Sequence, residues 1–171
     1  MILPQESLRT ATGSTRCHAP PFPDRPSIEV LPCNNKRVDS EQEYFTDGLT
    51  EDITTALARS PSLFVIARNS SFTYKGKAID IRQIGRELGV RYVLEGSVRR
   101  AGSRLRISAQ LIDAVTGGHC WAERYDRELG AIFAGQDEIT RSVAAAIEPE
   151  LMAAEGIRAL SRSSNDLSAW D

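Results

Sequence analysis

The chain of 171 residues is poor in the residue types that cross-link small folds or bind metals, with only three cysteines and two histidines. Cys17, Cys33 and Cys120 are far apart and form no C-x-x-C pair, which argues against a disulfide framework or a zinc site. We expect reduced thiols. A chain of this length buries roughly 70% of the surface that its unfolded form exposes, so one domain with tails needs no cross-links to fold.

The sequence also lacks an excess of one charge and any long apolar run. Its 21 basic and 23 acidic side chains give a formal net charge of -2, which does not favour nucleic acid or an anionic membrane as a partner. No apolar run approaches the roughly 20 residues of a spanning helix. The N-terminus has no apolar stretch after a basic one, unlike a secretory signal. We expect a cytoplasmic protein without membrane insertion.

What is present is a regular alternation of strand-like and helix-like segments. Residues 1–25 are rich in Pro, Ser, Thr and Arg without an apolar period, and they predict a disordered linker. Residues 26–155 predict the folded domain. Its expected elements are a strand at 27–31, a helix at 41–59, a strand at 63–67, a helix at 81–88, a meander of three strands within 90–125, and a helix at 131–154.

Local signals support these elements. Phe45, Leu49, Ile53 and Leu57 recur every four residues and predict one buried stripe. The unbroken apolar run at 63–67 predicts a strand covered on both faces.

The second helix has predicted boundaries at both ends. Asp80 with Gln83 resembles a capping box, and Gly89 stands where a helix C-terminal glycine is expected. Pro149 should kink or split the last helix, and residues 156–171 predict a loose polar tail. The order β-α-β-α-β-β-β-α predicts an α/β (α+β) domain with a five-stranded mixed sheet and about three helices, packed mainly on one face.

No catalytic signature emerges. Lys75-Gly76-Lys77 lacks the upstream glycine of a phosphate-binding loop, and Ala78 replaces the hydroxyl residue, so a solvated turn is favoured.

Three further clusters are explained by structural roles rather than by a functional site. Asp47, Glu51 and Asp52 could bind a metal, but favourable placement on the helix dipole is preferred. His119 and Cys120 are strand neighbours that point to opposite faces and cannot converge on one ion. The arginines at 99, 100, 104 and 106 predict a solvated sheet edge rather than a nucleic-acid surface. We therefore expect no catalytic residue, metal site or cofactor.

Two segments are candidates for contact with a partner or an anion. The segment from 68 to 77 is basic and polar. The segment from 121 to 127 mixes aromatic and charged residues, as interface hot spots do, although a core aromatic with a charged flank fits equally well. The residues that we expect to make such contacts are Arg68, Asn69, Ser70, Tyr74, Lys75, Trp121, Arg124 and Tyr125.

Several phrases carry a family resemblance: SIEVLP at 27–32, EQEYFTDGLTEDI at 41–53, FVIARNSSF at 64–72, GRELGVRYVLEGSVR at 85–99 and WAERYD at 121–126. Over residues 26–160 the chain resembles the TolB-amino-terminal-like module of bacterial proteins that have an adenylate/guanylate cyclase domain before it and tetratricopeptide repeats after it. The resemblance implies a mixed five-stranded sheet. Residues 165–170 resemble the entry to the first repeat helix. Cys33 departs from the usual phenylalanine, and residues 1–24 do not resemble a cyclase domain.

The sequence leaves two functions open. The favoured one is a non-catalytic regulatory or interaction module, whose partner is another protein or the neighbouring cyclase and repeat domains. The alternative is a fragment of a class III adenylate/guanylate cyclase that binds a nucleotide through the loop at 68–77. A periplasmic role like that of TolB is a weaker third idea, because no secretory signal is found. A homodimer also stays open.

Overall fold

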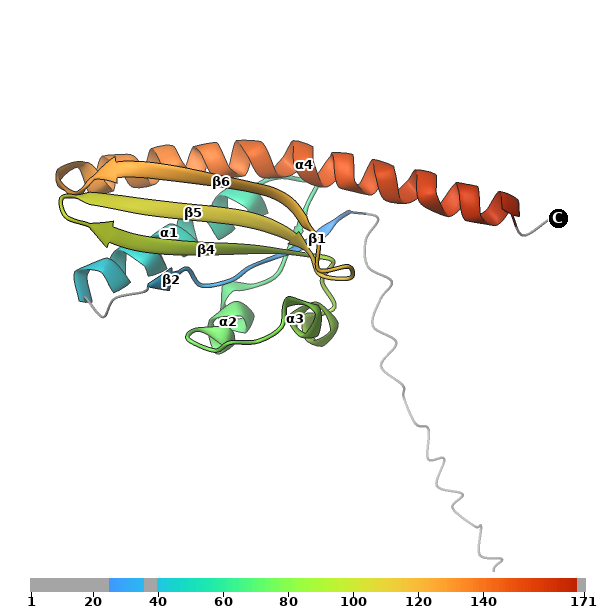
Figure 1. Cartoon of the computed structure of the whole chain (residues 1–171), viewed down its shortest axis with the longest axis horizontal. Coiled ribbons are helices and arrows are strands. Elements are labelled where there is room, and N and C mark those ends of the chain that lie inside the picture. Colours follow the sequence, from blue (N-terminus) through green and yellow to red (C-terminus); the bar gives the residue numbers. More distant parts are fainter. Residues whose placement is uncertain (1–24, 36–39, 169–171) are drawn as a thin grey trace, which may run out of the picture.

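The computed structural model of the chain describes residues 25–35 and 40–168. The linker expected at 1–25 therefore lies outside the described residues, except for Arg25. Figure 1 shows how the helices and strands are arranged. The strands are β1 (Ser27–Val30), β2 (Asn34–Asn35), β3 (Phe64–Val65), β4 (Tyr92–Ala101), β5 (Arg104–Asp113) and β6 (His119–Glu128). The helices are α1 (Ser40–Ala58), α2 (Arg68–Ser71), α3 (Ile81–Leu88) and α4 (Ile132–Ser168), with 3-10 turns η1 (Phe72–Tyr74) and η2 (Leu129–Ala131).

The strands form one mixed sheet in the order β3-β1-β4-β5-β6. β1 pairs in parallel with β3 and β4, whereas β4, β5 and β6 form an antiparallel meander. The predicted α+β class is therefore confirmed. The sheet has a sixth strand that the pattern did not predict, because β2 consists of two asparagines that pair in parallel with β4. Asparagine has no strand preference, so this pairing depends on the path of the chain.

The two faces of the sheet are covered unequally (Figure 1). α1 and α4 pack on one face and bury the main core, which includes Tyr92 and Leu94 of β4. α3 and its neighbours cover part of the other face, where Val93 and Ile84 belong to a smaller cluster. Neighbouring strand residues point to opposite faces. Val93, which lies between Tyr92 and Leu94, therefore packs in the second cluster.

The first half of the chain agrees with the predicted helix but not with the strand after it. All four stripe residues of α1, from Phe45 to Leu57, are buried. The strand predicted at 63–67 shrinks to Phe64 and Val65, which are half-buried. A strand covered on both faces was the wrong prediction, because β3 is the edge of the sheet beyond β1.

Helix α3 begins and ends where the sequence predicts. The Asp80 side chain accepts a hydrogen bond from the Arg82 backbone N–H at 3.1 Å, and Gly89 ends the helix with a φ of 66°. The reciprocal half of the capping box is absent, because the Gln83 amide donates to Glu87 Oε1 at 2.8 Å instead.

Helix α4 contradicts one of the two predicted effects of Pro149, namely a split into two helices. It is a single helix that continues through this residue to Ser168. Ile147 and Leu151, on either side of the proline, are fully buried. Their packing stabilises the helix on both sides of Pro149, although proline donates no backbone hydrogen bond.

The predicted loose tail is likewise helical as far as Ser168 (Figure 1). Two contacts hold the helix just beyond its predicted end. Arg91 Nη1 donates to the Glu155 carboxylate at 2.7 Å, and Arg158 Nη2 lies 2.9 Å from Asp113 Oδ2. In the described part of the chain, every helix is too short or too polar to cross a bilayer.

Candidate interaction surfaces

The segment between β3 and α3, expected to be a polar loop, forms the short helix α2 and the turn η1. Ion pairs attach it to α1. Arg68 Nη1 lies 3.0 Å from Glu51 Oε2, and Lys75 Nζ lies 3.0 Å from Glu43 Oε1 and 2.8 Å from Asp47 Oδ2. The hydrogen bond to Asp47 raises the pKa of Lys75. The acidic residues of α1 therefore pair with the cations of this segment.

The other predicted contact residues of this segment lie beside these cations. Asn69 is exposed, Ser70 is half-buried, and the Tyr74 hydroxyl donates to Glu87 Oε2 at 2.6 Å. The structure thus brings together all five residues predicted between 68 and 75. Because three carboxylates already surround the two cations, a further anion would meet repulsion as well as attraction. The anion contact stays a prediction.

The second predicted group lies on β6, at the other edge of the sheet, and does not join the first group. Trp121 is half-buried against the main core. Tyr125 is buried, and its hydroxyl donates to Glu123 Oε2 at 2.7 Å. Arg124 is exposed and has no hydrogen bond or ion pair with any described residue. Tyr125 is therefore a core aromatic, whereas Arg124 is a surface residue free to meet a partner.

The arginines of the β4–β5 hairpin include two that have acidic neighbours on β6. Arg104 Nε lies 2.8 Å from Glu128 Oε1, and Arg106 Nε lies 2.9 Å from Asp126 Oδ1. Both pairs are exposed, so each contributes about 1 kcal/mol or less. The predicted basic patch is thus partly neutralised across the strands.

A β-bulge changes the geometry expected at His119 and Cys120. Leu111 pairs with Trp121 and Ile112 pairs with His119, so Cys120 is an extra residue on β6. Across residues 25–35 and 40–168, no three His, Cys, Asp or Glu side chains are grouped as metal ligands. Cys33, the departure from the family pattern, is buried in the main core.

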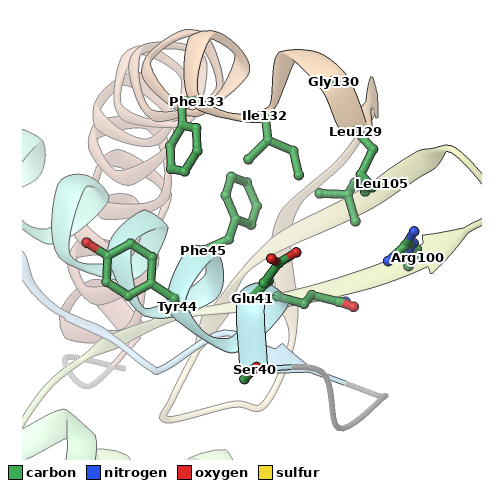
Figure 2. A pocket seen from close by; sticks show the side chains of 11 residues that line it. Ser40, Glu41, Tyr44, Phe45, Arg100, Leu105, Leu129, Gly130, Ile132 and Phe133 are labelled. Carbon is green, nitrogen blue, oxygen red and sulfur yellow. The ribbon is translucent and has the colours of Figure 1, made fainter.

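The sequence pattern missed a groove at one end of the sheet, which we call the end groove (Figure 2). It lies between the first turns of α1, the β4–β5 hairpin and the connection from β6 to α4, and its volume is about 520 Å³. Tyr44, which is 76% exposed, and Phe133, which is 73% exposed, lie at its rim, whereas Phe45 is buried. Exposed aromatic residues beside a concave apolar surface are typical of contact sites. The sequence signal was present, because Tyr44 and Phe133 lie beside the buried stripes of their helices.

A second feature that the sequence pattern missed is a buried carboxylate. Glu29 of β1 is fully buried, and neither carboxylate oxygen has a hydrogen-bond partner among the described residues. Burial raises the pKa of Glu29 to about 7. The nearby Ser71 hydroxyl lowers it in part, although this hydroxyl donates its own hydrogen bond to the Arg68 carbonyl at 2.9 Å. The sequence signal for this buried carboxylate was an acidic residue within the apolar run that forms β1.

Comparison with known sequences finds a relative much longer than this chain. No protein-family model matches. The chain is 60% identical over 152 residues to the Rhizobium meliloti protein named "Putative adenylate cyclase 3", a match that covers 89% of this chain and 26% of that protein. The chain thus spans about a quarter of the length of this curated relative. This sequence match confirms the expected similarity to part of a cyclase-related protein.

Solved structures with a similar fold are distant in sequence. A protein of Xanthomonas campestris is 13% identical with a TM-score of 0.53, covering 80% of this chain and 93% of that one. Lipoprotein GNA1162 of Neisseria meningitidis is 18% identical with a TM-score of 0.50, covering 71% and 98%. TolB of Acinetobacter baumannii is 17% identical with a TM-score of 0.49, covering 74% and 29%. At such identities the likeness concerns the fold alone.

Proposed function

We propose that the chain is a non-catalytic regulatory and interaction module of the TolB-amino-terminal-like type, belonging to a cyclase-related signalling protein in the cytoplasm. The observation that carries the proposal is the match to the Rhizobium meliloti relative, which takes in nearly all of this chain but 26% of that protein. The matched length corresponds to a fold with its own core. In this proposal cyclic nucleotide synthesis belongs to the remainder of the larger protein, and tetratricopeptide repeats are its neighbours.

The end groove is the proposed contact for a segment of that remainder. Its rim exposes Tyr44 and Phe133 to solvent, and its floor includes Phe45 (Figure 2). Covering one exposed aromatic side chain contributes about 2 kcal/mol. Two such residues at one groove can therefore anchor an apolar segment with measurable affinity.

A binding experiment tests this function. The remainder of the Rhizobium meliloti relative, without its matched region, is expressed separately and titrated with the present chain. We expect a complex, and Phe133→Asp should weaken it at least about tenfold because a charge would be desolvated in the groove. Leu160→Asp provides a matched control on the same helix, since Leu160 is 72% exposed and does not line the groove. No complex, or equal loss with both variants, would contradict the proposal.

The alternative function is nucleotide binding by a cyclase fragment. The name of the relative and the cations Arg68 and Lys75 favour it, whereas the carboxylates paired with these cations oppose it. Thermal unfolding in the presence of ATP, GTP or cyclic AMP, with Mg²⁺ or Mn²⁺, separates the two functions. A ligand-dependent rise in Tm that Lys75→Met removes would favour the alternative. No shift at millimolar ligand would eliminate it.

A further inference from the structure

β6 is a long edge strand of the sheet, and α4 runs beside it (Figure 1). It has β5 as its strand partner and no other among the described residues, and Figure 1 shows it as the outermost strand of the meander. It has ten residues and no proline, whereas β3 at the opposite edge has two residues. An open edge presents unpaired N–H and C=O groups that can pair with another strand.

We propose that β6 pairs with β6 of a second copy of this chain, antiparallel and centred on Tyr125. The charges along the strand are complementary in this register. Arg124 lies opposite Asp126 of the second copy, and Glu123 lies opposite Arg127 of the second copy. Two-fold symmetry repeats both pairs, so four opposite-charge pairs form and no like charges face each other directly.

The same charges disfavour neighbouring registers. A shift that centres the pairing on Arg124 places this residue against its own copy, and a shift to Asp126 does the same with two carboxylates. Like charges directly opposite each other in a sheet are destabilising. Registers centred between two residues are incompatible with a two-fold axis perpendicular to the sheet, because they would match residues of opposite faces. Among registers centred on residues 123–127, the charge pattern therefore selects one.

Of the residues in the proposed pairs, Arg124 is available, whereas Arg127 Nη2 lies 2.9 Å from Glu138 Oε1 of α4 and would share its charge between two carboxylates. Arg124 is exposed and has no partner within the described chain, so its charge is available. Asp126 already accepts from Arg106 at 2.9 Å and would lie between two arginines. Beyond the charged pairs, Ala122 would lie opposite Glu128 of the second copy, which is the last residue of β6.

The first test changes the most accessible charge. Sedimentation equilibrium of the full chain should give twice its 18.8 kDa mass, with association that weakens as salt increases. Arg124→Glu places two acids opposite each other and should raise the dimer dissociation constant about tenfold or more, whereas Arg124→Lys should retain association. Arg59→Glu makes the same charge change at the exposed residue that directly follows α1 and should have no effect. Thermal unfolding verifies that each variant is folded.

The second test fixes the register by cross-linking. Ala122 and Glu128 are exposed and lie opposite each other across the proposed axis. In a background with Cys17→Ser and Cys120→Ser, a mixture of Ala122→Cys and Glu128→Cys chains should form a disulfide-linked dimer, and neither variant should do so alone. A monomer at every concentration, a dimer unaffected by Arg124→Glu, or faster cross-linking of Ala122→Cys with Asp126→Cys would overturn the proposal.

Discussion

The two faces of the sheet differ in how many buried residues pack against them. Among the described residues, the face under α1 and α4 contributes to a continuous core of 20 buried residues, whereas the cluster under α3 has five. The second face also contains Glu29, a buried carboxylate without a hydrogen bond to any described residue. We therefore expect the first face to determine the stability of the fold and the second face to open locally without loss of the fold.

The largest expected effect comes from removing side-chain volume on either face. Leu49→Ala in the main core should lower the free energy of unfolding by roughly 2–5 kcal/mol and destabilise the whole domain. Ile84→Ala on the second face should cost less, near the lower end of that range, because α3 can move to fill the space. Chemical denaturation measures the change in the free energy of unfolding for each variant. Hydrogen exchange should be faster everywhere in the first variant and mainly in α2 and α3 in the second, and the reverse pattern would contradict the comparison.

Glu29→Gln should stabilise the protein at neutral pH. The carboxyl pKa rises from 4.5 to about 7 on folding, so the protonated form is favoured in the fold. Its contribution is fully present below pH 4.5 and is lost as pH rises to 7, a change of roughly 3 kcal/mol. The glutamine variant should lack this decline. Denaturation midpoints across that pH range test it, and parallel curves for both proteins would contradict a raised pKa.

Glu155→Gln should destabilise the C-terminal part of α4, which extends beyond the sheet (Figure 1). The carboxylate accepts hydrogen bonds from Arg91 at 2.7 Å and from the Tyr92 hydroxyl at 2.8 Å. Although burial raises its pKa, these hydrogen bonds lower it overall. Their contribution is therefore present above the unfolded pKa and lost in acid. We expect a cost of roughly 1–2 kcal/mol at neutral pH, with faster hydrogen exchange after residue 150.

Phe133→Ser should have the smallest effect on stability. The side chain is 73% exposed at the end groove, so the free energy of unfolding should change by about 0.5 kcal/mol or less. Leu160→Ser, at another exposed apolar residue of α4, should behave similarly in unfolding experiments. A loss above this range with Phe133→Ser alone would mean that the residue belongs to the core rather than to a contact surface.

Periodic patterns in the sequence predicted most of the elements on the face that α1 and α4 cover. The stripe of α1 and the alternation of β5 record burial directly in the order of residues, and Asp80 and Gly89 mark the ends of α3. β2 could not be predicted, because its pairing depends on where β4 lies. The continuation of α4 through Pro149 depends on the burial of Ile147 and Leu151 by other elements.

The candidate surfaces were predicted less well for the same reason. The pattern grouped Arg124 with its aromatic neighbours, but it could not separate this exposed side chain from the buried Tyr125. The end groove joins α1, the β4–β5 hairpin and the start of α4, which are far apart in the sequence. Only their packing brings Tyr44 and Phe133 to one rim (Figure 2).

The most direct measurement is cyclic nucleotide formation, with ATP or GTP and Mn²⁺, by the present chain and by the remainder of the Rhizobium meliloti relative. A non-catalytic module predicts no product from the chain alone. It also predicts that adding the chain changes the rate of the remainder, and that the Phe133→Asp variant does so less. Product formed by the purified chain itself would contradict the account.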